Sequence, residues 1–272
     1  MSFWVRHIRL YRLLISLGVR ARASQKILDT ISKRIKKNPV LVVNGLKMKF
    51  DPRSSQDILI YDSIEKGAGY EPGVTKLLLS TIKKGMTFVD VGANSGYYTL
   101  LASGCLGRSG KIIALEPQSI VFRRLKDNVK INKIKNVILL HKAAYSERKK
   151  VKIGIPRWGD AETSIDYPNS LRYENVDAVT IDSICKNPDI IKIDVEGYEL
   201  EVLQGAKKAL KNVKCIVFEQ NIRRLVERDM DPNIVINFLK REGFNIYDSE
   251  TGEKIESYRD AVSIGSNFYA KR

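Results

Sequence analysis

The middle of the chain alternates short, uniformly apolar runs with longer segments of helical periodicity. The apolar runs are TFVDV at 87–91, KIIALEP at 111–117, NVILLHKAA at 136–144, DIIKIDV at 189–195 and KCIVFEQ at 214–220. Helices are predicted to begin near Ser95 and to cover 120–132, 198–210 and 232–243, with two last strands at 244–249 and 261–271. Strands that are apolar on both sides are typical of a parallel sheet covered on both faces by helices. The sequence therefore predicts an α/β fold.

Other segments frame this core. Residues 40–50 predict a β-hairpin, because Asn44-Gly45 between two strand-like runs suits a type I′ turn. A helix is predicted from Pro72, a favourable first helical position. Residues 151–180 are rich in Pro, Gly, Asn and Asp and predict an insertion that could act as a lid. We divide the chain into an N-terminal extension (1–39) and one domain (40–272), made of a hairpin and helix (40–84), a core (85–219) that holds the insertion, and a closing helix and strands (220–272).

The chain is strongly basic, with 47 Lys and Arg against 31 Asp and Glu and a formal net charge of +16. Such a surface favours anionic partners. An equal alternative is a lysine-rich surface that keeps the protein in solution and has no anionic partner. The N-terminal extension has no acid before Asp29, and Arg6, Arg9 and Arg12 interrupt its apolar residues. It is therefore too charged to span a bilayer. The extension predicts a basic amphipathic helix on an acidic membrane surface. The alternatives are a helix that packs on the main domain and a loose basic tail.

Carboxylates follow four of the five core strands. Asp90, Glu116 and Glu219 end the first, second and fifth strands, and Asp194 and Glu196 end the fourth. Ligands of open α/β sheets bind beyond the carboxyl ends of the strands, so we expect these side chains at one rim. Carboxylates that are gathered together repel one another unless a cation or hydroxyl donors offset the charge. The pattern predicts a site for a positively charged, hydroxyl-bearing ligand, the alternative being that these acids only cap helices and turns.

The turn after the first strand contains two glycines, Gly92 and Gly96, but it departs from the dinucleotide fingerprint G-x-G-x-x-G. Asn94 takes the place of the second glycine and Tyr97 that of the third. The second glycine is the one that lets the backbone approach a pyrophosphate, so a dinucleotide is disfavoured here. S-adenosylmethionine, a nucleoside with a positive charge, is better suited. Glu116, about 20 residues further on, is then predicted to accept both ribose hydroxyls.

Four motifs together resemble the FkbM-type S-adenosylmethionine-dependent methyltransferases. They are FVDVGANSGYYTL (88–100), IIALEP (112–117), IIKIDVEGYELEVLQGA (190–206) and the acid of IVFEQ (216–220). The resemblance covers about residues 71–219. It implies a class I, Rossmann-like, seven-stranded and mostly parallel sheet with one antiparallel strand near an edge. It also implies cofactor contacts at Asp90, Gly92, Asn94, Gly96 and Glu116, to which we add the adjoining candidates Ala93, Pro117 and Ala143.

The same resemblance implies methyl transfer, usually to oxygen, and a hydroxyl acceptor must then lose its proton. The chain holds only two histidines, so a carboxylate is the candidate base. We predict Asp194 in this role, supported by Glu196 and Glu219. Lys192 is disfavoured, because strand alternation places it on the same face as Asp194 but deeper in the sheet. A helix start at residues 194–197 is the alternative interpretation, and a Mg²⁺ ion on Asp194 and Glu219 is a further option.

The predicted function is methyl transfer from S-adenosylmethionine to an oxygen of a small-molecule, glycan or lipid-linked acceptor. An RNA methyltransferase is the second hypothesis, because the basic surface and the aromatic residues Tyr167 and Tyr173 could bind phosphates and bases. A non-catalytic binding module is the third. Cys105, Cys185 and Cys215 form no metal motif and indicate a reducing compartment. We therefore expect a cytoplasmic protein, with peripheral membrane attachment through the N-terminal helix as an alternative.

Overall fold

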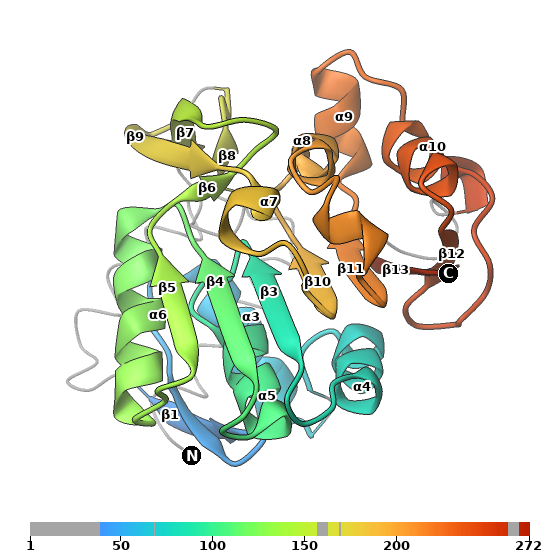
Figure 1. Cartoon of the computed structure of the whole chain (residues 1–272). Coiled ribbons are helices and arrows are strands. Elements are labelled where there is room, and N and C mark those ends of the chain that lie inside the picture. The colour runs from blue at the N-terminus through green and yellow to red at the C-terminus, as the bar shows by residue number, and fades with distance from the viewer. Residues whose placement is uncertain (1–38, 68, 157–162, 169, 261–266) are drawn as a thin grey trace.

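The computed structural model describes residues 39–67, 69–156, 163–168, 170–260 and 267–272. Within them, a seven-stranded sheet lies between two layers of helices (Figure 1). Across the sheet the order is β12 (Asn245–Asp248), β13 (Asn267–Lys271), β11 (Cys215–Glu219), β10 (Ile190–Ile193), β3 (Thr87–Val91), β4 (Lys111–Leu115) and β5 (Val137–Leu140). Strand β13 is antiparallel to both of its neighbours, whereas the other pairs are parallel. The predicted sheet, with one antiparallel strand next to an edge, is confirmed.

One face of this sheet packs against the N-terminal part of the domain. The elements on this face are the hairpin β1 (Val40–Val43) and β2 (Leu46–Lys49) with helices α3 (Ser55–Glu65), α4 (Pro72–Thr81), α5 (Tyr97–Leu106) and α6 (Ser119–Ile131). The hairpin is confirmed, since Asn44 and Gly45 have φ angles of 46° and 81°. Helix α4 begins at Pro72 as predicted. Helix α3 is an addition to the predicted elements, and its cap is the Ser54 hydroxyl, which accepts from the Asp57 amide at 3.0 Å.

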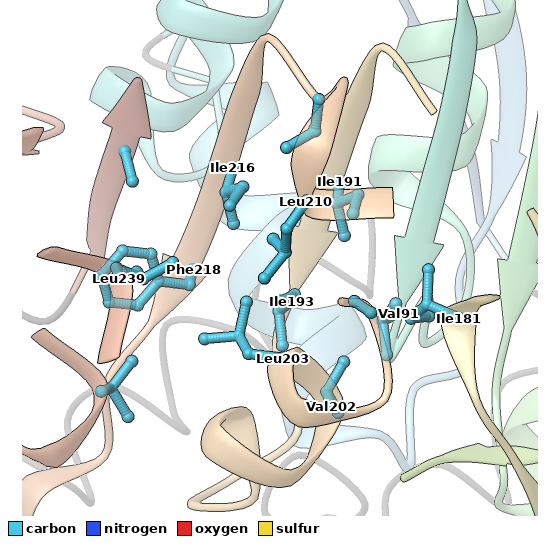
Figure 2. Packing of buried hydrophobic residues seen from close by; sticks show 14 of the residues in the cluster. Val91, Ile181, Ile191, Ile193, Val202, Leu203, Leu210, Ile216, Phe218 and Leu239 are labelled. Atoms are coloured by element: carbon cyan, nitrogen blue, oxygen red, sulfur yellow. The ribbon is translucent and has the colours of Figure 1, made fainter. Parts of the chain in front are cut away.

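The opposite face packs against α7 (Ile181–Ile184), α8 (Glu199–Gln204) and α10 (Ile234–Arg241), and α9 (Ile222–Glu227) follows β11. Figure 2 shows this core, in which Ile193 and Phe218 of the sheet lie near Leu203 of α8. Alternate residues of each strand serve opposite faces: Val91 packs in this core, whereas Phe88 packs in the other. Asp90 is two residues after Phe88, so its side chain points to the same face as that of Phe88, the face covered by the N-terminal part of the domain.

The segment predicted as an insertion forms most of a second sheet. Its strands, in order across the sheet, are β6 (Ala143–Ala144), β9 (Arg172–Val179), β7 (Lys149–Ile155) and β8 (Ser164–Ile165). The strand predicted over 136–144 is therefore two strands, because the chain leaves the main sheet after Leu140 and pairs with β9 from Ala143. The regular alternation of buried Val151 and Ile153 with exposed lysines was the available signal for β7.

Two predicted boundaries also differ from the structure. The helix predicted over 198–210 ends at Gln204 and is followed by a 3₁₀ turn at Ala209–Lys211. Gly205, between the two, lies so close to the second sheet that an added Cβ would be 2.1 Å from the Tyr145 carbonyl oxygen. The predicted N-terminal amphipathic helix falls in residues 1–38, outside the described residues. In the described part of the chain, no helix is long and apolar enough to cross a membrane.

Candidate active site at the carboxyl ends of the strands

A cleft opens between the carboxyl ends of the central strands and the second sheet, with about 920 Å³ of space that is partly open to solvent. Of the residues predicted from the sequence, its walls include Gly92, Asn94, Glu116, Pro117, Ala143, Asp194, Glu196 and Glu219. The structure thus brings the cofactor candidates and the catalytic candidates to one cavity. Asp90, Ala93 and Gly96 are not among the residues that line it.

Asp90 lies behind the cleft wall rather than on it. Its side chain is 0% exposed, and the Thr99 hydroxyl donates to Oδ2 at 2.6 Å. Its Oδ1 is buried without a hydrogen-bond partner among the described residues. Burial raises the pKa of Asp90, and the nearby Lys192 ammonium acts in the opposite direction. Asp90 therefore lies beneath the glycine turn and does not line the cleft, and its contact with a cofactor stays a prediction.

Position 92 requires a glycine, because the ends of β3 and β10 approach each other closely there. The φ of Gly92 is +75°, and an added Cβ would lie 1.8 Å from the carbonyl oxygen of Asp194. At Gly96, with φ +101°, a Cβ would lie 2.7 Å from a methyl group of Leu125 in α6. Both glycines therefore let other parts of the protein come close, and Asn94 between them also takes a left-handed conformation with φ 50°. The turn brings Asp194 next to the end of β3.

Glu116 is held by the backbone on both of its oxygens. The Asn94 amide donates to Oε2 at 3.0 Å, and the Gln118 amide donates to Oε1 at 2.8 Å. A carboxylate offers about four acceptor sites, so these two bonds fix its orientation without exhausting its capacity. The side chain is 6% exposed and lines the cleft. Its geometry suits a pair of neighbouring hydroxyl donors.

The other side of the cleft gathers carboxylates from three elements. Asp194, Glu196 and Glu219 meet there with Glu71, which precedes α4. Burial, together with the charges of Asp194 and Glu196, raises the pKa of Glu219 to about 9. Burial likewise raises the pKa of Glu71. Since raised carboxyl pKa values mean that negative charge is disfavoured, this side is complementary to a cationic ligand.

Lys192 is the buried cation of this cluster. Its ammonium donates to Asp194 Oδ2 at 2.8 Å and lies 4.8 Å from the centre of the Tyr98 ring. Burial alone lowers the pKa of Lys192, but the carboxylates of Asp194, Asp90 and Glu71 outweigh it and raise the pKa above its ordinary value. Lys192 therefore stays protonated at neutral pH, and it lies on the face of Asp194 but deeper, as strand alternation predicts.

Glu71 is a site residue that the sequence reasoning missed. Its φ is 43°, an uncommon value for a residue other than glycine. The Tyr98 hydroxyl donates to Oε2 of Glu71, and the Asn267 amide donates to Oε1 at 3.3 Å. Gln56 and Tyr70 of the same N-terminal segment also line the cleft. The only available signal was an acid directly before Pro72, which the sequence reasoning took for a helix start.

The second sheet closes the cleft by contacting both of its sides. The Thr163 hydroxyl donates to Gln118 Oε1 at 3.0 Å, next to Glu116. The Ser164 hydroxyl donates to the backbone carbonyl of Glu196 at 2.7 Å. Residues 163 and 164 therefore connect the end of β4 to the end of β10. The sequence did not predict these contacts, because both residues lie in the segment predicted as an insertion.

The turn at residues 194–197 precedes α8, which begins at Glu199. Glu196 and Gly197 have φ angles of 55° and 93°. The Gly197 amide donates to Glu199 Oε1 at 2.9 Å, and the Asn221 amide donates to Glu196 Oε2 at 2.6 Å. Burial raises the pKa of Glu199 to about 7. The acids at 194 and 196 are thus presented to the cleft by an ordered turn and are not part of the helix.

The donor set does not fit the Mg²⁺ ion considered from the sequence. Among the described residues, no group of three or more His, Cys, Asp or Glu side chains could hold a metal. The Lys192 ammonium, 2.8 Å from Asp194, already supplies a positive charge where the ion would bind. A nucleoside that carries a sulfonium and an ammonium fits better, because it brings cationic charge to the acidic side and ribose hydroxyls to Glu116.

The chain is similar to several known proteins. The chain is similar to hexuronic acid methyltransferase AglP of Haloferax volcanii, with 26% identity over 200 residues that span 72% of this chain and 77% of that protein. Among solved structures, methyltransferase FkbM of Methylobacillus flagellatus KT has 15% identity and a TM-score of 0.43, covering 68% of this chain and 43% of that one. The precorrin-6y C5,15-methyltransferase of Geobacter metallireducens GS-15 has 18% identity and a TM-score of 0.42, covering 73% and 88%.

The chain also matches a protein family. The methyltransferase FkbM domain matches residues 90–246, more than half of the chain, from Asp90 at the end of β3 to Ile246 in β12. This range contains the glycine turn, Glu116 and the acids that follow β10 and β11. The chain therefore belongs to the FkbM methyltransferase family and is an S-adenosylmethionine-dependent methyltransferase.

Proposed function

We propose that the protein methylates a hydroxyl group of a glycan that contains an acidic sugar, with Asp194 as the general base. The observation that carries the proposal is that one cleft contains both Glu116, with its oxygens oriented by backbone amides, and Asp194, with its oxygen oriented by Lys192. The similarity to a hexuronic acid methyltransferase over most of the domain supports a glycan acceptor.

The cofactor half of the proposed site lies at the ends of β3 and β4. S-adenosylmethionine, when bound, supplies a methyl group already activated by its attachment to a sulfonium. Glu116 would accept the ribose hydroxyls, and the cleft residues Gly92, Asn94, Pro117 and Ala143 would surround the nucleoside. Glu71 and Glu219 would face its cationic end, where their charge is most needed.

The acceptor half lies at the end of β10. The Asp194 side chain is 23% exposed and lines the cleft, so an acceptor hydroxyl can reach it. Lys192 cannot be the base because it remains an ammonium, and it instead holds one oxygen of Asp194 in place. Asp194 would take the hydroxyl proton as the oxygen gains its methyl group. Alignment of donor and acceptor supplies about 7–11 kcal/mol of such a barrier, and proton removal adds about 10²–10⁴-fold in rate.

The acceptor class is tested with the full chain, S-adenosylmethionine and pairs of matched oligosaccharides. Each pair differs only in whether its terminal sugar is a hexuronic acid or the corresponding neutral hexose. We expect mass spectrometry to show the gain of one methyl group on the acidic member, at a rate at least about tenfold above that of the neutral member, because one specific hydrogen-bonded contact is worth that much. Fragmentation of the product then locates the methyl group on a ring oxygen.

Two results would overturn this assignment. Methylation of RNA but of neither oligosaccharide would support the RNA alternative, for which the exposed Tyr173, with Lys152 4.1 Å from its ring centre, is the remaining structural support. Tyr167, the other aromatic residue considered, is buried, with the Arg224 guanidinium 4.6 Å from its ring centre. Equal rates for the acidic and neutral members would leave the methyltransferase but remove the acidic sugar from the proposal.

A further inference from the structure

A second, shallower groove lies beside the active-site cleft, on the side of the domain where the chain passes from the main sheet into the second sheet. It is formed by the end of β5, the residue before β6, the beginning of β7, the end of β9 and helix α7. Figure 1 shows these elements together at the upper left of the molecule. The residues that line it are Leu140, Lys142, Arg148, Lys149, Lys150, Asp177, Ala178, Val179, Ser183 and Ile184. No predicted site residue is among them.

The lining of this groove is strongly cationic. It holds four basic side chains, Lys142, Arg148, Lys149 and Lys150, and one carboxylate, Asp177, which leaves an excess of three positive charges. Strand register brings three of these side chains together. Asp177 is the Cα partner of Lys150 across β7 and β9, and it stands next to Lys142 because β6 pairs in parallel with β9 at Ala143 and Ala178.

The single carboxylate does not neutralise this cluster. The Lys142 ammonium is 3.8 Å from Asp177, and both side chains are substantially exposed, so the pair is weak. Lys149 is paired with Glu147 at 3.3 Å and lies 3.9 Å from the Tyr145 ring centre. Arg148 and Lys150 are exposed and form no salt bridge with any residue that the structure describes. A concave surface with two such cations concentrates positive potential and attracts anions.

The chemistry of the groove favours a phosphate over a carboxylate. A sugar carboxylate carries one charge, which a single lysine satisfies. A phosphate or diphosphate carries more charge and several acceptor oxygens, which suit an arginine fork and lysine ammonium groups that approach from different strands. The Ser183 hydroxyl at the edge of the groove already donates to the Thr180 carbonyl oxygen at 2.8 Å, so the basic side chains carry the interaction.

Lys142 connects the groove to the active site, because it lines both the groove and the cleft that contains Glu116 and Asp194. We propose that the groove binds a phosphate or diphosphate group of the methyl acceptor, while the sugar to be methylated lies in the cleft. This inference rests on the proposed function only for the identity of the ligand. Anion binding itself is measured without the cofactor and without methyl transfer, so the two proposals fail separately.

The test uses inorganic pyrophosphate as the probe and isothermal titration on the full chain. The groove variant is Arg148→Gln with Lys150→Gln. The control variant, Lys76→Gln with Lys84→Gln, removes the same charge from α4 and the turn after it, which lie on the opposite side of the molecule (Figure 1). All four side chains are exposed, so neither variant is expected to unfold the protein. Titration at about 0.15 M ionic strength limits attraction by the overall charge, because the Debye length is then about 8 Å.

We expect saturable pyrophosphate binding that is weakened at least about tenfold in the groove variant and less than about twofold in the control, because only the groove variant loses charge-assisted hydrogen bonds to the anion. The proposal would be overturned if pyrophosphate showed no saturable binding, or if both variants weakened it equally.

A second measurement uses vesicles of phosphatidylcholine with and without phosphatidic acid. Binding to the acidic vesicles that is equal in the two variants supports the acceptor as the source of the phosphate. Loss of vesicle binding in the groove variant alone would assign the groove to a membrane lipid and overturn the acceptor assignment.

Discussion

The two sides of the active-site cleft satisfy their carboxylates in opposite ways. At the ends of β3 and β4, Glu116 accepts backbone amides on both oxygens, and these bonds exist without any ligand. At the ends of β10 and β11, the carboxylates of Asp194, Glu196 and Glu219 face one another, with Lys192 as the buried cation beside Asp194. One side is oriented by the backbone in advance, whereas the other gathers acidic groups, and the pKa values of Glu71 and Glu219 are raised there.

This difference indicates how the work of binding is divided. A carboxylate that is already fixed by amides binds neutral hydroxyls with little further ordering, so we propose that the β3–β4 side determines where the nucleoside lies. Carboxylates with raised pKa values are stabilised when a cation arrives, so the β10–β11 side responds to charge. We infer that the first side provides position and the second provides complementarity to the sulfonium and the base for proton transfer.

The largest expected effect comes from Asp194→Asn. The amide oxygen can still accept from Lys192, so the buried ammonium keeps a partner, but the side chain can no longer take a proton. We expect kcat to fall by about 10²–10⁴-fold, as for removal of a general base. The affinity for S-adenosylmethionine, measured by isothermal titration, should change much less. Asp127→Asn, an exposed position on α6 outside the cleft and the groove, is the matched control with unchanged kcat.

Glu116→Gln gives the reciprocal result on the other side. We expect cofactor affinity to fall by about 10–100-fold, since hydrogen bonds to a charged group are worth about 1.5–3 kcal/mol. At saturating cofactor, kcat should be affected far less than in Asp194→Asn. If both variants lowered affinity equally and left kcat unchanged, the division between the two sides would be wrong.

A smaller effect, on stability, is expected where the two sides meet. Gly92→Ala forces a Cβ to within 1.8 Å of the Asp194 carbonyl oxygen, at a φ of +75°. Gly45→Ala is the matched control, because Gly45 has φ +81° and nothing lies within 4 Å of the added Cβ. Backbone strain costs about 1–2 kcal/mol in both variants, and the collision adds about 1–3 kcal/mol at Gly92 only. Urea unfolding measures the difference, and equal losses would show that the strand ends can separate freely.

A further effect on stability is a pH dependence due to Glu219. Burial and the charges of Asp194, Glu196 and Glu71 raise its pKa to about 9 from an ordinary value of 4.5. The folded, cofactor-free protein therefore keeps a proton that the unfolded chain loses above about pH 4.5. Its free energy of unfolding should decrease as pH rises from about 5 to 9, with a smaller decrease in Glu219→Gln.

Cofactor binding should depend on pH in the opposite direction. A bound cation favours ionised Glu219, so binding releases a proton and tightens by up to about tenfold from pH 6 to pH 7, where the cofactor amine is still protonated. Titrations in two buffers of different ionisation enthalpy measure the released proton directly. A pH dependence that persists unchanged in Glu219→Gln would assign the proton to another group of the acidic side.

Much of the site was predictable from the sequence because parallel strands impose a simple geometry. Acids that directly follow buried strands must meet at one rim, and Glu116, Asp194 and Glu219 do so. Glu71 was not predictable in this way. It comes from the segment before the core, and its place beside Tyr98 depends on how α4 packs against the sheet. The place of Asp90 was not predictable either, because its position one residue before the end of β3 buries it under the turn, where it does not line the cleft.

The sequence by itself determined the alternation of strands and helices in the core, the family and the rim at which the acids gather. These features depend on local periodicity and on a fixed rule of sheet geometry. Tertiary structure alone decided which carboxylates share charge, which are fixed by amides, and how Lys142 joins a cationic groove to the cleft. Such properties depend on distances and burial between residues far apart in the chain, and electrostatic energies in a protein change steeply with both.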